Sequence, residues 1–201
     1  MRTDDRGAAM ILALLVTLLL AGLGLSLTLL GDMERRIAYN FRVDQEAWWA
    51  VDAAIERAAA DLSQAPDWDV VLAGARCSPF ADSTHRPVLP SSEILDLDAA
   101  TSDLQAATSA AASFGANTPV WHLYAWGLLN SMTPRPSPGG SYLAMWVADD
   151  VSETDGNPAD DSNDIVTIHA EAFGPGGAHR TAEAYVKRAG TTVRILARRS
   201  L

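Results

Sequence analysis

The chain has 201 residues, a formal net charge of −10 and one cysteine, Cys77. With one candidate membrane span, this length leaves about 170 residues, which suits a single soluble domain. The acidic balance and the lack of a Lys/Arg stripe argue against nucleic acid as a partner, because neutralising phosphates requires clustered cations. A lone cysteine excludes an internal disulfide, so the soluble domain must be held together by its core.

An uncharged apolar run from Ala8 to Leu30 is the first element of the chain. As a helix it would cover roughly 35 Å, enough to cross the hydrocarbon core of a bilayer. The leader before it, MRTDDRG (residues 1–7), is short, carries charges of both signs and ends in Gly7, unlike a secretory signal peptide. We therefore predict a membrane tether whose N-terminal end is cytoplasmic, although arginines flank the span on both sides.

Apolar residues recur at helical spacing beyond the span, and no proline occurs before Pro66. The pattern predicts one helix of about 55 residues, roughly 80 Å long, from Ala8 to Leu62. Residues 8–31 are apolar all round and residues 32–64 are amphipathic, so a soluble domain must cover the stripe between Phe41 and Leu62. The stripe consists of Met33, Ile37, Phe41, Trp48, Val51, Ile55, Ala58 and Leu62.

Residues 65–119 are interrupted by prolines and contain a stretch rich in Ala, Ser and Asp. We expect an irregular loop region here. A short helix between Ser91 and Ala112, capped by Ser91 or Ser92, is the alternative.

Residues 120–201 have the alternating and aromatic pattern of β-strands. Turn signals such as TPRPSPGG, GPGG and Gly190 divide them into four or five antiparallel strands. A long helix followed by such a sheet predicts an α+β fold, in which the sheet packs on the amphipathic half of the helix and forms one soluble domain with residues 32–119. The expected strands are VWHLYAW, SYLAMWVA, DIVTIHAEAF, HRTAEAYVKR and TTVRILAR.

The loop of residues 149–164 contains seven carboxylates. Such oxygen ligands suit Ca²⁺, although their spacing does not match an EF-hand. The alternative is a solvated hairpin loop and a protein without cofactors. If calcium binds, the expected ligands flank the turn GNP: Asp155, Asp160, Asp161 and Asp164.

Histidines and the cysteine offer weaker candidate sites. His169 and Glu171 share one face of a predicted strand, where we expect an exposed polar face rather than a metal or acid–base pair. Cys77, Asp82 and His85 lack the strand–turn–helix setting of an activated nucleophile. We therefore predict no enzymatic activity.

Residues 1 to about 64 resemble the N-terminus of PilX-type minor pilins and of the K-type minor pseudopilin of type II secretion. The similarity rests on RGAAMILALLVTLLLAGLGL, a leader ending in glycine before a small residue and a leucine-rich span. It rests also on AWWAVDAAI, which is similar to the A-F-x-A-A-E-A-A-L segment of the family. Beyond residue 64 only the layout matches. The resemblance implies a pilin-like fold and a structural subunit.

The resemblance implies that a prepilin peptidase cuts after Gly7 and leaves Ala8 as the mature N-terminus. Most pilins carry a glutamate at the fifth mature position, which neutralises the free amine of a neighbouring subunit. Leu12 stands at that position in this chain. A subunit without the carboxylate is expected at the filament tip, because an unpaired charge is costly in an apolar core.

The resemblance thus predicts a minor pilin or pseudopilin that helps initiate or cap a type IV pilus or a type II secretion pseudopilus through helix packing. The residues expected to act in this assembly are Leu12, Met33, Ile37, Phe41, Trp48, Val51 and Ile55. Its partners would be the prepilin peptidase, other minor pilins, the major pilin and the inner-membrane assembly platform. The soluble domain would lie in the periplasm before assembly. The alternative is a single-pass signal-anchored periplasmic domain that binds a ligand or partner and does not polymerise; an envelope-assembly factor outside the filament is a third interpretation.

Overall fold

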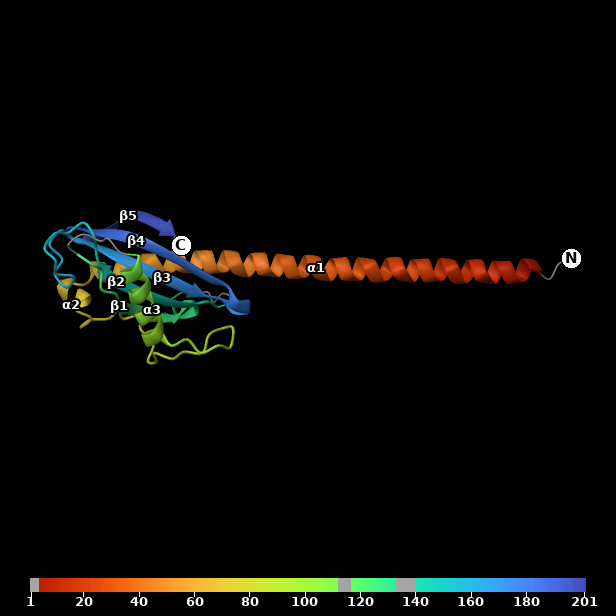
Figure 1. Cartoon of the computed structure of the whole chain (residues 1–201), viewed down its shortest axis with the longest axis horizontal. Coiled ribbons are helices and arrows are strands. Elements are labelled where there is room, and N and C mark those ends of the chain that lie inside the picture. Colours follow the sequence, from red (N-terminus) through yellow and green to blue (C-terminus); the bar gives the residue numbers. More distant parts are fainter. Residues whose placement is uncertain (1–3, 112–116, 133–139) are drawn as a thin grey trace. The chain divides into compact units, whose positions relative to one another are not determined.

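The computed structural model describes residues 4–111, 117–132 and 140–201 (Figure 1). The chain divides into two compact units, Met1–Arg42 and Val43–Leu201. Helix α1, the longest element, spans Asp4–Ser63 and contributes residues to both units. The predicted α+β class, with a long N-terminal helix and a C-terminal antiparallel sheet, is confirmed.

In the first unit the chain is helical from Asp4 onward, so α1 begins four residues before the predicted start at Ala8. The leader contains no proline, and nothing in it prevents the helix from starting before Gly7. Gly22 and Gly24 do not interrupt the helix either. As the apolar run predicts, α1 is long and apolar enough to cross a membrane.

In the second unit, the part of α1 after Val43 buries an alanine-rich face. Small side chains on this face let the helix backbone approach the sheet closely. We predicted that the domain covers the stripe between Phe41 and Leu62. This is confirmed for the last four residues of the stripe, which are buried. It is wrong for Phe41, which is exposed, and holds only in part for Trp48, which is half-buried. The buried residues recur every three or four positions: Val43, Ala47, Ala50, Val51, Ala54, Ile55, Ala58, Ala59 and Leu62.

The sheet of the second unit is antiparallel, and its five strands lie in chain order. Alternate residues of its third strand, including Val166 and Ile168, join the buried face of α1 in one hydrophobic core. The strands agree with the predicted segments to within two residues, and the turn TPRPSPGG lies outside the described residues except for Gly140. The strands are β1 (His122–Leu128), β2 (Tyr142–Asp149), β3 (Ile165–Phe173), β4 (His179–Ala189) and β5 (Thr192–Ser200).

The opposite face of the sheet carries a second buried cluster. Helix α3 (Leu97–Ala110) and the loop before it contribute to this cluster, whereas the short helix α2 (Asp69–Leu72) contributes to the first core. Strand β2 is therefore buried along its whole length. The second cluster consists of Leu89, Leu97, Trp121, Trp126, Tyr142, Ala144, Trp146 and Ala148.

Helix α3 corresponds to the short helix considered as the alternative for the region after Ser91. It is capped by Asp96, whose side chain accepts the N–H of Ala99 at 3.1 Å. Capping by Ser91 or Ser92 was therefore wrong. Ser92 has a φ of 71°, whereas an N-cap residue adopts an extended conformation.

Two indole groups attach α3 to the sheet. Trp146 on β2 donates from Nε1 to Thr101 Oγ1 at 2.7 Å. Trp121, just before β1, donates from Nε1 to Thr108 Oγ1 at 2.8 Å. Because both indoles are buried, these bonds satisfy donors that would otherwise carry a desolvation cost.

Replacing Ile55 by alanine is expected to lower the free energy of unfolding of the second unit by about 2–5 kcal/mol, because the side chain is fully buried and its removal leaves a cavity. Urea unfolding of the full chain in detergent, followed by tryptophan fluorescence, would measure this. The matched control is Ile37→Ala on the same helix, where the side chain is 64% exposed and the expected change is within about 0.5 kcal/mol. Equal losses in the two variants would contradict the assignment of the buried face.

Candidate functional site

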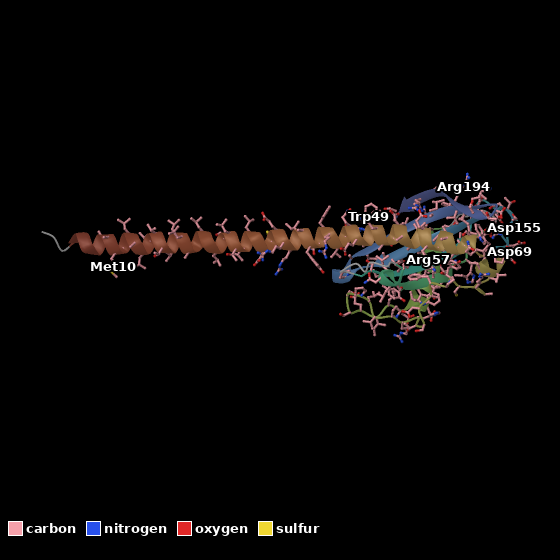
Figure 2. All side chains as sticks on the ribbon, turned by 180° about the vertical axis from the view of Figure 1, so that it is seen from behind. Met10, Trp49, Arg57, Asp69, Asp155 and Arg194 are labelled. Atoms are coloured by element: carbon pink, nitrogen blue, oxygen red, sulfur yellow. The ribbon has the colours of Figure 1, made fainter. Side chains whose placement is uncertain are left out.

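The first unit presents an apolar surface around α1, and large apolar side chains from Met10 to Phe41 are exposed along it (Figure 2). Three hydroxyl groups interrupt the span, on Thr17, Ser26 and Thr28. Each donates to a carbonyl three or four residues earlier at 2.9 Å. Their donors are thus satisfied within the helix, as a lipid-like environment requires.

The residues predicted to act in processing and assembly fall into two groups. Gly7, Ala8 and Leu12 lie on α1 in the first unit and are exposed, as are Met33 and Ile37. The last residues of the predicted assembly stripe are buried in the core of the second unit. Val51 and Ile55 therefore stabilise the second unit.

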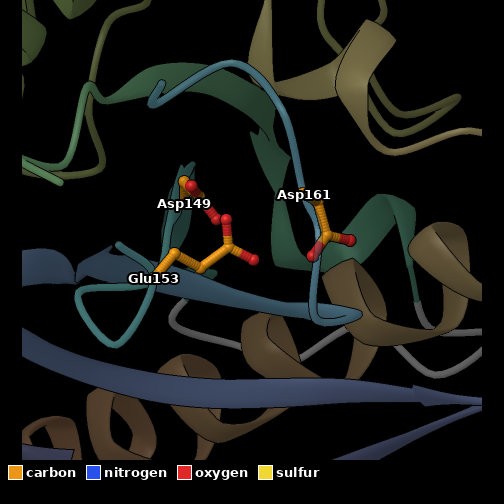
Figure 3. A group of neighbouring side chains, drawn as sticks. All are labelled: Asp149, Glu153 and Asp161. Atoms are coloured by element: carbon orange, nitrogen blue, oxygen red, sulfur yellow. The ribbon is translucent and has the colours of Figure 1, made fainter. Parts of the chain in front are cut away.

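A group of carboxylates lies at the end of β2 and in the loop that follows. Oxygen atoms of Asp149, Glu153 and Asp161 all lie within 4.8 Å of one another. Figure 3 shows the three side chains pointing toward one another, with the carboxylate of Glu153 between those of the two aspartates. Asp149 and Glu153 are buried and Asp161 is half-buried. We call these three residues the acidic cluster.

Hydrogen bonds hold each member of the acidic cluster in place. Asn117 donates from Nδ2 to Asp149 Oδ2. The backbone N–H of Ser162 donates to Glu153 Oε1 at 2.9 Å, and that of Ile165 donates to Asp161 Oδ1 at 3.1 Å. The cluster is therefore built from the end of β2, the loop, the start of β3 and the segment before β1.

Burial changes the acidity of two of these groups. It raises the pKa of Asp149 to about 7, against the opposing effect of the hydrogen bonds from Asn117 and the Asp150 amide. Burial also raises the pKa of Asp161 to about 6, with the nearby carboxylates adding to the effect. These carboxyl groups are thus held in a site that disfavours negative charge unless a positive charge is supplied.

The acidic cluster includes only one of the four ligands expected from the sequence, Asp161. Asp155 and Asp160 are exposed in the same loop, and Asp164 lies 3.7 Å from Arg188 in an ion pair. Asp149 and Glu153, which lie beside Asp161 in the structure, were not among the ligands expected from the sequence. The available signal was the position of Asp149, directly after the apolar residues of β2, where a carboxylate is expected to be buried.

A second group of charged side chains surrounds His169 in the middle of the sheet. His169 is only 4% exposed, and both ring nitrogens meet carboxylates: Nδ1 lies 3.1 Å from Glu183 and Nε2 lies 3.2 Å from Glu171. Glu171 also faces His179 at 2.8 Å, and Arg199 donates from Nε to Glu183 at 2.9 Å. The expectation of an exposed polar face is wrong here.

His169 is buried because the second face of the sheet is covered by other side chains. Trp121 and Trp146 make edge contacts with the ring of His169, at centroid distances of 5.6 and 5.8 Å. A buried ring between two carboxylates is stabilised as the imidazolium ion, since it can then donate from both nitrogens. The arrangement is a satisfied structural ion network.

The network shifts the pKa values of its members in opposite directions. Burial alone would lower the pKa of His169, but hydrogen bonds to Glu171 and Glu183 outweigh it and raise the pKa. Burial alone would raise the pKa of Glu171, but hydrogen bonds from His169 and His179 lower it to about 2. The pKa of Glu183 is lowered in the same way, by His169 and Arg199 against burial.

The three residues considered as a nucleophile set have separate partners. Cys77 is exposed, and its Sγ lies 3.9 Å from the carbonyl of Leu123. His85 faces Asp98 at 2.9 Å, and the side chain of Asp82 accepts the N–H of Ser83. Among the described side chains, no hydrogen bond joins two members of this set.

The comparisons with known proteins gave one match. Residues 6–56 match the family model described as PilX N-terminal. This match covers the segment on which the resemblance to PilX-type minor pilins rests, and it confirms that resemblance. Searches of the curated proteins and of the solved structures each found no match.

Replacing His169 by glutamine is expected to destabilise the second unit more at pH 6 than at pH 9. The lowered pKa values of Glu171 and Glu183 add stability above about pH 4.5, which is lost as the pH falls toward their folded values. The raised pKa of His169 adds stability that is complete below about pH 6.5 and is lost as the pH rises through its folded value. Removing the charged hydrogen bonds should cost about 1.5–3 kcal/mol at pH 6.

Urea unfolding of the full chain in detergent at the two pH values would measure this difference. His85→Gln is the matched control, because His85 forms an exposed pair with Asp98 whose loss should change the stability by less than about 1 kcal/mol. A loss for His169→Gln that is equal at both pH values would show that the ring does not change its charge between them.

Proposed function

We propose that this chain, whose residues 6–56 match the family model described as PilX N-terminal, is a structural subunit of a type IV pilus or a type II secretion pseudopilus. In this role it helps to initiate or cap the filament through packing of its N-terminal helix. The family is structural, and the proposed function requires no catalytic step.

The observation that supports this proposal most directly is the exposed apolar surface of α1 in the first unit. Side chains such as Leu14, Leu18 and Leu25 are more than half exposed, and the hydroxyls between them are satisfied by helix carbonyls. Such a surface is unstable in water and needs either lipid or other helices around it. The same surface can therefore hold the precursor in the inner membrane and later pack against the helices of other subunits.

Leu12 supports a position at the end of the filament. A cut after Gly7 places Leu12 where most pilins carry the glutamate that pairs with a neighbour's amine. A subunit that lacks this carboxylate leaves the neighbour's amine unpaired in an apolar core, which is costly. The tip is the position at which this cost is avoided.

The proposal also includes cleavage of the leader, the location of the second unit and the partners of the subunit. The prepilin peptidase would remove residues 1–7 and leave Ala8 as the N-terminus. The second unit would lie in the periplasm before assembly, and other minor pilins, the major pilin and the inner-membrane assembly platform would be the partners. Either type of filament is compatible with these features.

Replacing Gly7 by leucine is expected to abolish processing. The wild-type protein recovered from membranes of cells with a prepilin peptidase should begin at Ala8, and the variant should begin at Met1. Mass spectrometry of the N-terminal peptide would measure both. The physical reason is that a branched side chain at the cleavage position obstructs the peptidase, whereas the apolar run that anchors the chain is unchanged.

The matched control is Gly22→Leu, which makes the same substitution in the same helix with nothing within 4 Å of the added Cβ. This variant should still begin at Ala8. A wild-type chain that begins at Met1 would favour the single-pass anchor. A start near Ala21 or beyond would identify an ordinary signal peptide and overturn the proposal.

Replacing Leu12 by glutamate is expected to change the position of the subunit in the filament. With the carboxylate present, a neighbour's amine can be paired, so the subunit should be found along the filament as well as at its ends. Immunogold electron microscopy with an antibody against the second unit would measure this distribution. Leu12→Gln has a similar shape without the charge and should stay at the ends, and wild-type label along the whole filament would contradict the tip position.

A further inference from the structure

Within the described part of the chain the acidic cluster, unlike Glu171 and Glu183 on the sheet, has no positive partner. Glu171 and Glu183 are paired with histidines and Arg199. Across the described ranges 4–111, 117–132 and 140–201, no basic side chain forms an ion pair with Asp149, Glu153 or Asp161. Three carboxylates within 4.8 Å repel one another and are costly to bury without a compensating charge.

Two buried oxygen atoms without partners belong to a member of the cluster, Glu153, and to a residue that contacts it, Asn117. Glu153 is only 5% exposed, and its Oε2 has no hydrogen-bond partner. Asn117 is 1% exposed, and its Oδ1 also has none, although Nδ2 of the same amide donates to Asp149 Oδ2. Buried acceptors are almost always satisfied in folded proteins, so these two oxygens indicate a missing partner with positive character.

Hydrogen bonds prearrange the cluster around its unsatisfied oxygens. Glu153 uses Oε1 for the Ser162 amide, which leaves Oε2 free. The Asp161 amide in turn donates to Asp69 Oδ1 at 3.0 Å, which attaches the loop to the start of α2. These bonds hold the loop that carries Glu153 and Asp161 in position before an ion binds.

We propose that Asp149, Glu153 and Asp161 bind a calcium ion, with the buried amide of Asn117 beside them. Carboxylate and amide oxygens are the hard ligands that Ca²⁺ prefers, and water can complete its coordination. Ligands on opposite sides of a Ca²⁺ ion lie up to about 5 Å apart, against about 4.2 Å for Mg²⁺. Oxygens that all lie within 4.8 Å of one another can therefore face a single Ca²⁺ ion.

The bound ion would link the end of β2 to the start of β3. Asp149 is the last residue of β2, whereas Asp161 lies four residues before β3 begins at Ile165. Neutralising the cluster removes the repulsion between the carboxylates and stabilises the loop of residues 149–164. The site is independent of the helix surface on which the proposed filament function rests.

Isothermal titration calorimetry of the chelator-treated full chain in a non-ionic detergent, with calcium chloride, tests the proposal. We expect one site with a dissociation constant of about 10⁻⁵–10⁻³ M and at least tenfold weaker binding of magnesium. The thermal midpoint should rise by about 5 °C or more at calcium concentrations far above the dissociation constant. No heat of binding and no shift at about 10 mM calcium, well above that range, would overturn the proposal.

Two nearly isosteric variants locate the site. Glu153→Gln and Asp161→Asn should each weaken calcium binding at least tenfold, whereas Asp160→Asn, with the same charge change in the same loop, should stay within about twofold of the wild type. Without calcium, Glu153→Gln should melt at or above the wild-type temperature, because it removes a repulsive buried charge. Loss of binding in Asp160→Asn alone would overturn the assignment.

Discussion

The second unit depends on burying both faces of its antiparallel sheet. Strand β2 has no exposed residue, with the alanine-rich face of α1 joining the core on one side and α3 contributing to the cluster on the other. A sheet covered on both faces cannot leave polar side chains in water at its centre. Charged groups that are buried in this way need a compensating charge, and the two charged clusters are the places where this need arises.

The two clusters meet this requirement in different ways. Around His169, the strands supply both signs of charge in register: His169 lies opposite Glu183, and Glu183 lies opposite Arg199. At the end of β2 the loop supplies carboxylates alone, and the oxygens of Glu153 and Asn117 lack partners. The first cluster is complete within the chain, whereas the second is completed by a cation in our proposal.

Helix α1 carries two kinds of surface in one continuous element. Up to Arg42 it is apolar over much of its length and exposed, which suits lipid or the helices of other subunits. From Val43 onward its apolar face narrows to alanines and a few larger residues that pack on the sheet. A substitution in the first part is therefore expected to affect anchoring and assembly, and one in the second part to affect the stability of the soluble unit.

The sequence by itself determined the elements whose signals are local. The long uncharged run, the helical spacing of apolar residues and the alternation in residues 120–201 predicted α1 and the strands to within a few residues. The segment that resembles PilX-type minor pilins was also visible in the sequence, and residues 6–56 match that family model. The tertiary structure alone decided which face of each element is buried. Phe41 was expected under the sheet and is exposed, whereas His169 was expected in solvent and lies beneath two tryptophans. The tertiary structure alone also decided the surroundings of the acidic cluster, where Asp149 meets Asn117 from 32 positions away in the chain. The physical reason is that periodicity depends on neighbouring residues, whereas burial and charge pairing depend on segments that meet only when the chain folds.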